Sequence, residues 1–409
     1  MAALRGVHSA FTWVQRNERE IAEGQLELAR IPAPPFGEQA RSEWLQQRFR
    51  SLGLHDVHVD SIGNVVGVRP GTNRDAKFIA LCAHIDTVFP AGTPLDVRRE
   101  GDRLYGPGIS DNGAGVSGLL AIISAMQAGE IKTAAPTVFI GNVGEEGEGD
   151  LRGMRHIFAD PEWKNAIAYT VVLDGANADT IVTQALGSRR FEVTVRGPGG
   201  HSWSDFGTPN PIVLLARTID AFSRAIVPTN PKTTFNVGVI SGGTSVNSIP
   251  ESASMRVDIR SSSMDEIDRL ERVLREALEK ATHGLAVKNG DKVTTPTPAN
   301  SADGGQRENA SVTYEVKLIG SRPAAELPEG ARILQVVQAV DAHLQNPSKL
   351  QRASTDANVP LSLGREAITV GAGGLGGGAH TVHEWYDPRG RDLGLKRVLL
   401  TVLTLAGAE

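Results

Sequence analysis

A short apolar segment that ends in a histidine and an aspartate constrains the fold of this chain more than any other feature of its sequence. Residues 78–81 are continuously apolar, and His84 and Asp86 follow, two positions apart. Such a run is typical of a strand buried in a parallel sheet. Side chains two apart share one face of an extended chain, so both would point beyond the strand's carboxyl end, where open α/β sheets keep their active sites. Taken alone, the pair fits a metal site or a hydrogen-bonded structural pair.

Two later apolar strands also end in acidic residues. Residues 137–142 are followed by Glu145 and Glu146, and residues 169–173 are followed by Asp174. A glycine-rich turn between these strands and the first one carries Asp111, just before a long apolar helix. Asp111 could cap that helix, reach a metal, or do both, since a carboxylate has two oxygens. Because parallel strands end at one edge of a sheet, these acids can meet.

The order of the elements predicts the fold class. Strands and helices alternate through residues 1–186, which predicts an α/β domain with a mostly parallel central sheet flanked by helices. Residues 187–322 read as β-α-β-β-α-β, the pattern of a small α+β ferredoxin-like domain. Residues 323–409 return to the helix-rich pattern of residues 1–186. The smaller domain is therefore predicted to be inserted between two parts of a catalytic, metal-binding domain.

Bulk properties exclude several classes of partner. A net charge of −5 disfavours nucleic acid and anionic membranes, and no apolar run is long enough to cross a bilayer. The single cysteine excludes an internal disulfide, and the first 20 residues lack the apolar core of a signal peptide. We expect a cytoplasmic protein.

The acidic and imidazole side chains together suggest a metal centre. Histidine and carboxylate ligands without a thiolate suit zinc, or otherwise cobalt or manganese. Two such ions would share a bridging carboxylate. Of the neighbours Glu145 and Glu146, one could bind metal while the other takes a proton from water, although an acidic solvated loop is the alternative. Asp86 is placed to orient the imidazole of His84.

Six motifs occur in order along the chain: Ala83-His84-Ile85-Asp86-Thr87, Gly108-Ile109-Ser110-Asp111-Asn112, Gly144-Glu145-Glu146-Gly147, Leu173-Asp174-Gly175, Gly199-Gly200-His201-Ser202, and His380-x-x-x-Glu384. As a set they resemble the co-catalytic zinc family of tripeptidases, glutamate carboxypeptidase, aminoacylase, and the acetylornithine and succinyl-diaminopimelate deacylases. The resemblance extends over nearly the whole chain.

The resemblance implies two zinc ions per subunit with five ligands: His84 and Asp174 for one ion, Glu146 and His380 for the other, and Asp111 as the bridge. It also implies that Asp86 is the orienting acid and that Glu145 is the general base. His383 is an alternative to His380, which we prefer because His380 keeps the family's spacing to Glu384.

Further roles implied by the resemblance fall in the inserted domain. This domain would mediate homodimerisation, and His201 would reach the partner subunit's site to stabilise the tetrahedral oxyanion. Asn247 and Arg260 match positions that hold the substrate's carboxylate, a task that suits the arginine fork.

These inferences predict a dinuclear zinc hydrolase that cleaves an amide bond near a free terminus of short peptides, using metal-activated water and Glu145 as base. One alternative is a deacylase or carboxypeptidase that acts on N-acyl amino acids, and another is a carbamoyl-amide hydrolase. A third is a catalytically silent binding protein on the same fold. The sequence does not distinguish the end of the substrate that is cleaved.

Overall fold

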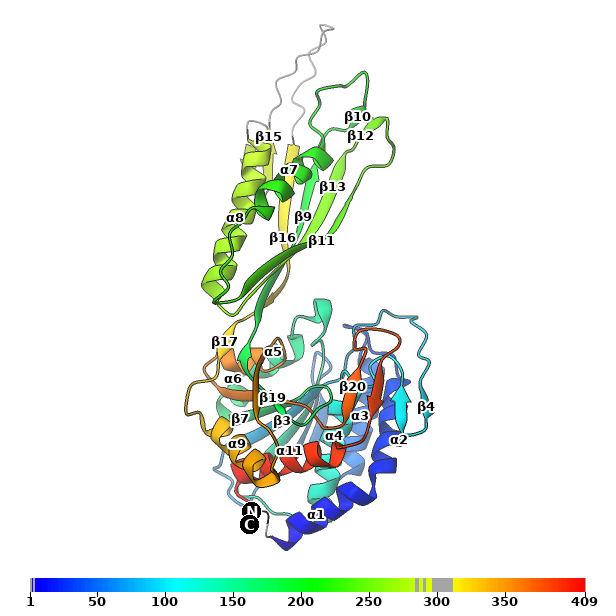
Figure 1. Ribbon diagram of the computed structural model, residues 1–409, viewed down its shortest axis with the longest axis vertical. Coiled ribbons are helices and arrows are strands. Elements are labelled where there is room, and N and C mark those ends of the chain that lie inside the picture. The colour runs from blue at the N-terminus through cyan, green and yellow to red at the C-terminus, as the bar shows by residue number, and fades with distance from the viewer. Residues whose placement is uncertain (1, 3, 284–286, 290–291, 296–311, 409) are drawn as a thin grey trace. The chain divides into compact units, whose positions relative to one another are not determined.

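The computed structural model of this protein describes residues 2, 4–283, 287–289, 292–295 and 312–408. The chain divides into two compact units, and Figure 1 shows the elements of each. The first unit consists of Met1–Ala185 and Ala325–Glu409, and the second of Leu186–Ala324.

A nine-stranded sheet forms the centre of the first unit within the described residues. Its strands lie in the order β1 (His55–Val59), β2 (Val65–Arg69), β6 (Thr137–Asn142), β3 (Phe78–His84), β7 (Ile167–Leu173), β19 (Glu366–Val370), β8 (Thr180–Ala185) and β17 (Ala325–Glu326), with β18 (Lys349–Ala353) also paired to β8. The four strands β6, β3, β7 and β19 run parallel to one another. The predicted α/β fold with a parallel central sheet is confirmed.

The register of these strands positions the site. Ala83 and His84 of β3 lie opposite Gly141 and Asn142 of β6, so the two strands end together. Apart from the partly buried Phe78 at its start, β3 is buried along its length, as expected for a strand covered on both faces. The residues that follow β3, β6 and β7 therefore leave the sheet at the same edge.

Helices flank this sheet (Figure 1). They are α1 (Arg5–Arg16), α2 (Glu18–Ala29), α3 (Gln39–Ser51), α4 (Gly113–Ala128), α5 (Arg152–Ala159), α6 (Pro161–Ala166), α9 (Arg332–Leu344), α10 (Asn358–Ser362) and α11 (Arg391–Ala406). Helices α4 and α11 pack against β3. At the start of α4 the capping residue is Asn112, whose side chain accepts a hydrogen bond from the Gly115 amide at 3.0 Å. The capping role considered for Asp111 therefore belongs to its neighbour.

A small antiparallel sheet joins two distant loops of the first unit. Its strands lie in the order β20 (Leu375–Gly377), β21 (Trp385–Asp387), β5 (Arg103–Tyr105) and β4 (Arg98–Glu100). The loop between β20 and β21 contains His380, and the loop after β5 contains Asp111. Pairing of β21 with β5 brings these loops together.

The second unit is the ferredoxin-like domain that the sequence predicts. Its antiparallel sheet has the order β11 (Thr233–Gly242), β13 (Ser252–Ser261), β9 (Gly187–Arg196), β16 (Val312–Arg322), β15 (Lys292–Thr295) and β14 (Val287–Asn289). Helix α7 (Pro211–Ser223) follows β9, and helix α8 (Met264–Thr282) follows β13. Both helices pack on this sheet through apolar residues, and Leu270 and Leu274 of α8 are fully buried.

In the part of the chain that the structure describes, no helix has both the length and the apolar character needed to span a membrane.

Candidate metal centre

The predicted ligands gather at the carboxyl edge of the central sheet. His84 is the last residue of β3, and Asp174 directly follows β7. Glu145 and Glu146 follow β6 and precede a short 3₁₀ helix, η1 (Gly147–Gly149). Asp111 comes from the glycine-rich loop before α4.

Two groups of side chains share Asp111. In the first, His84 Nε2 lies 3.2 Å from Asp111 Oδ1 and 3.8 Å from Asp174 Oδ1. In the second, His380 Nε2 lies 3.1 Å from Asp111 Oδ2 and 3.1 Å from Glu146 Oε1. Within each group of three, the potential ligand atoms lie within 4.8 Å of one another. The structure thus brings all five predicted metal ligands together.

The charges of the site favour bound cations. Burial opposes a proton on His84, but the carboxylates of Asp111, Asp174 and Asp86 outweigh it and raise the pKa of His84 well above its usual value. Hydrogen bonds from His380 to Asp111 and then Glu146 raise the pKa of His380 to about 10. The same carboxylates would attract a metal ion, which competes with these protons because it binds neutral imidazole.

Asp111 also offers a free lone pair for a metal. Its side chain is 20% accessible, but the Oδ1 atom is buried and, apart from the 3.2 Å contact with His84 Nε2, has no partner among the described residues. Burial favours a neutral carboxyl, but His380 and His84 overcome it and lower the pKa of Asp111. A buried, charged oxygen of this kind fits direct coordination to a cation. The donor set contains only nitrogen and oxygen, which suits zinc, cobalt or manganese.

Asp86 contacts more than the histidine for which it was predicted. Its carboxylate accepts the backbone amides of Glu145 at 3.0 Å and Glu146 at 2.8 Å. His84 Nδ1 lies 3.6 Å from the Asp86 carboxylate and 3.2 Å from the Asp86 carbonyl oxygen. Asp86 therefore fixes the turn that carries the two glutamates, in addition to lying beside His84.

Glu145 belongs to a third, overlapping group with His84 and Glu146, again within 4.8 Å. Both glutamates are buried. The acidic-loop alternative therefore does not describe these two residues, because they do not face bulk solvent. The exposed residue of the pattern is Glu148, on η1.

The contacts favour His380 over His383. Both histidines are exposed, but His380 joins Asp111 and Glu146, whereas His383 appears in none of the groups formed by the described residues.

Glu384 is a supporting residue that sequence reasoning did not assign. Its buried carboxylate accepts three backbone amides, from Gly108, Ser110 and Asp111, each at 2.7 Å. Burial raises the pKa of Glu384 to about 7, although these amides oppose the shift. It fastens the loop that presents Asp111. The motif His380-x-x-x-Glu384 contained this residue, but no local pattern indicates its partners.

Asp356 and Asn142 form a second supporting pair that the sequence did not reveal. Asn142, opposite His84 in the sheet, donates through Nδ2 to Asp356 Oδ2 at 2.6 Å. Both side chains are fully buried, and the Oδ1 atom of each has no hydrogen-bond partner among the residues described. Burial raises the pKa of Asp356 to about 7. A protonated Asp356 could donate to the Asn142 amide oxygen, which an ionised one cannot do.

Replacing Asp356 should therefore change the pH dependence of stability in the metal-free protein. Because the folded-state pKa of Asp356 is about 7 and its ordinary value 3.8, stabilisation by the neutral acid is complete below the lower value and is lost as pH rises through the higher one. Relative to Asp356→Asn, the wild-type free energy of unfolding should fall by on the order of 4 kcal/mol between about pH 4 and about pH 8. Urea denaturation measures it, and equal pH slopes would contradict a neutral Asp356.

The remaining predicted residues lie in the second unit. His201, on β10 (Gly200–His201), is exposed, and its Nδ1 accepts the Trp203 amide at 3.1 Å. Asn247 precedes the partner strand β12 (Ser248–Ile249), and its carbonyl oxygen accepts the Ser202 amide at 3.0 Å. His201 and Asn247 therefore share one surface loop region. Arg260, on β13, bonds through Nε to Asp258 at 2.6 Å.

An α/β sheet that presents two histidine-carboxylate groups around one shared aspartate fits a metal-dependent hydrolase. Residues 80–403 match the peptidase family M20/M25/M40, and the chain belongs to this family. The resemblance seen in the sequence and the prediction of a hydrolase are thereby confirmed.

Individual relatives agree with this assignment. Carboxypeptidase G2 of Pseudomonas sp. is 26% identical over 284 residues, and the match spans 66% of this chain and 66% of that protein. A Staphylococcus aureus tripeptidase has a TM-score of 0.73 at 19% identity, covering 95% of this chain and 99% of the tripeptidase. A Bacillus subtilis dinuclear metal-binding peptidase of family M20 has a TM-score of 0.64 at 14% identity, covering 96% and 99%. At these identities the two structures establish the fold alone.

Proposed function

We propose that this protein is a dinuclear zinc-dependent hydrolase that cleaves an amide bond near a free terminus of short peptides. The observation that carries this proposal is the position of Asp111, whose two oxygens lie 3.2 Å from His84 Nε2 and 3.1 Å from His380 Nε2. A carboxylate between two separate groups of ligands suits a bridge between two cations.

The ligand assignment follows from the two groups: His84 and Asp174 would hold one ion, Glu146 and His380 the other, and Asp111 both. Zinc suits these nitrogen and oxygen donors, with cobalt and manganese as substitutes. The contact of His84 Nδ1 with the Asp86 carbonyl oxygen, at 3.2 Å, supports a tautomer with its proton on Nδ1. Nε2 then keeps its lone pair for a metal.

When bound, the cations would lower the pKa of a water molecule towards about 7 and polarise the scissile carbonyl. Glu145 would accept the proton of that water and return it to the leaving amine. Its burial beside His84 and Glu146 supports this role. Asp86 would keep Glu145 in place through the 3.0 Å hydrogen bond from the Glu145 amide.

The roles proposed for the second unit concern assembly and substrate binding. We propose that it forms a homodimer, that His201 serves the partner subunit's oxyanion, and that Asn247 and Arg260 hold the substrate carboxylate. Strand β11 supports dimerisation, because it is a sheet edge and exposes Val239 and Ile240, which are 51% and 56% accessible. Exposed apolar edge strands tend to pair with another chain.

A carboxypeptidase or deacylase acting on N-acyl amino acids is the second candidate. The likeness to carboxypeptidase G2 favours it.

A cytoplasmic location remains a prediction, supported by the single, buried Cys82.

The direct test measures hydrolysis after metal removal and replacement. EDTA-treated protein would receive zinc, cobalt or manganese and then a free tripeptide, an N-acetylated tripeptide, a tripeptide amide, an N-acyl amino acid or an N-carbamoyl amino acid. We expect two equivalents of zinc per chain to restore cleavage of the free tripeptide. Loss of cleavage with one blocked terminus identifies the recognised end. Cleavage of only the N-acyl amino acid would favour the second candidate, and no cleavage with any metal would refute both.

A further inference from the structure

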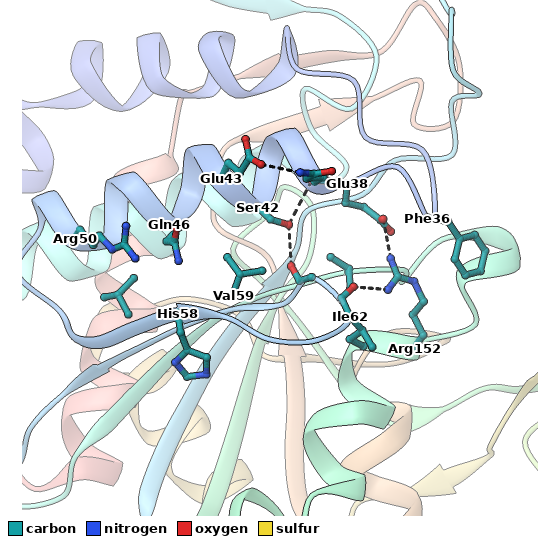
Figure 2. A pocket seen from close by; sticks show the side chains of 14 residues that line it. Phe36, Glu38, Ser42, Glu43, Gln46, Arg50, His58, Val59, Ile62 and Arg152 are labelled. Atoms are coloured by element: carbon teal, nitrogen blue, oxygen red, sulfur yellow. Dashed lines mark hydrogen bonds and ion pairs between the residues drawn. The ribbon is translucent and has the colours of Figure 1, made fainter.

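A cavity of about 580 Å³ lies between helix α3 and the segment that runs from β1 to the start of β2. Figure 2 shows Arg152, the first residue of α5, at one end of this cavity. Its guanidinium points towards Glu38 and Ile62, with the ring of Phe36 beside it. These residues belong to three segments that are far apart in the chain.

Arg152 connects these segments through its fork of nitrogens. Nη1 donates to the Ile62 carbonyl oxygen at 2.7 Å, and Nη2 donates to Glu38 Oε2 at 2.7 Å. The guanidinium carbon lies 5.0 Å from the centre of the Phe36 ring. The Glu38 side chain is only 4% accessible, so loss of Arg152 would leave a buried carboxylate without this cationic partner.

The stem of Arg152 supports the turn that carries Glu145 and Glu146. Gly144 has a φ of +67°, and a Cβ atom on it would lie 2.6 Å from Arg152 Cγ and 2.7 Å from Arg152 Nε. The arginine therefore lies flat against the residue that precedes Glu145. Such close packing leaves the turn little freedom to shift towards α5.

A neighbouring contact, made by Asn64, fixes the same turn. The Val143 amide donates to Asn64 Oδ1 at 3.0 Å, and Asn64 Nδ2 donates to the Gly153 carbonyl oxygen at 3.1 Å. Residues 143 and 144 are thus held between the start of α5 and the loop before β2.

We propose that Arg152 is a positioning residue for the metal centre: its paired guanidinium and packed stem hold the Gly144 turn so that Glu145 and Glu146 reach the metals. The inference rests on the proposed function for the roles of these glutamates. A lysine could not replace the arginine fully, because one ammonium cannot reproduce the planar fork that spans Glu38 and Ile62.

The cavity makes a specific experiment possible. In Arg152→Ala, guanidinium ions could enter through the cavity and occupy the place of the lost group. We expect zinc affinity at the Glu146 site and kcat each to fall by about tenfold to a hundredfold, as for other residues that orient metal ligands. Guanidinium at non-denaturing concentration should restore part of both, whereas ammonium or sodium at equal ionic strength should not.

Arg50→Ala is the matched control, because Arg50 lines the same cavity and carries the same charge. It should keep wild-type zinc affinity and kcat, with no response to guanidinium. If Arg152→Ala does not fold, Arg152→Lys supplies the test, with the expected fall in zinc affinity measured by chelator competition. Unchanged zinc affinity in a folded Arg152 variant, or a loss in Arg152→Ala that guanidinium does not restore, would overturn the proposal. Wild-type protein that binds zinc but cleaves no substrate would remove the proposed function and leave the affinity comparison valid.

Discussion

Replacing Glu145 with alanine should lower kcat by about 10² to 10⁴-fold, the usual contribution of a general base, while both metal ions remain bound. We expect this variant to lose turnover but keep its metal ions, because the turn places the two glutamates differently. Glu146, not Glu145, contacts His380 and completes a ligand group with Asp111. Steady-state kinetics and metal analysis on the same zinc-loaded sample would measure both quantities.

Glu148→Ala provides the control for this prediction, since Glu148 lies three residues further along and is exposed. It removes the same charge from the same acidic segment. We expect wild-type kcat in this variant. Full activity in Glu145→Ala would exclude Glu145 from proton transfer, and loss of a metal from that variant would make it a ligand.

Replacing His380 with alanine should reduce the bound zinc from two ions to one per chain and lower kcat by more than a hundredfold. Removal of a residue that only supports a ligand lowers metal affinity or activity by about tenfold to a hundredfold, and removal of a direct ligand should lower them further. His380 lies 3.1 Å from both Asp111 and Glu146, so its loss leaves one group with two carboxylates and no imidazole. Equilibrium dialysis with zinc would count the ions.

His383→Ala serves as the matched control, because it removes an exposed imidazole from the same loop. Two ions should remain in this variant. If instead His383→Ala loses an ion and His380→Ala retains both, the choice between the two histidines is wrong.

The sequence predicted where the candidate metal ligands meet, because several of them follow a rule of sheet geometry. His84 ends one parallel strand and Asp174 directly follows another, and strand direction alone places such residues at one edge. The fold class was predictable for a different reason, since alternating strands and helices and the later β-α-β-β-α-β order are local patterns. His380 needed its spacing to Glu384, because the pairing of β20, β21, β5 and β4 that delivers it is not local.

The supporting contacts were not predictable, because each joins residues far apart in the chain. Glu384 bonds to the loop of Asp111 across more than 270 positions, and Asn142 bonds to Asp356 across 214. A buried acid bonded to backbone amides leaves no spacing pattern. Asp86 shows the same limit: the spacing His84-x-Asp86 suggested a contact with the imidazole, but not the hydrogen bonds from the Glu145 and Glu146 amides, 59 and 60 positions along the chain.

The position of β19 has a consequence for synthesis on the ribosome. This strand, Glu366–Val370, lies between β7 and β8, both of which emerge nearly two hundred residues earlier. Until β19 has been synthesised, a nascent chain lacks the strand that lies between β7 and β8. It also lacks Glu384, whose carboxylate accepts hydrogen bonds from the loop that carries Asp111. The first unit can therefore reach its native form only after β19 and Glu384 have been synthesised.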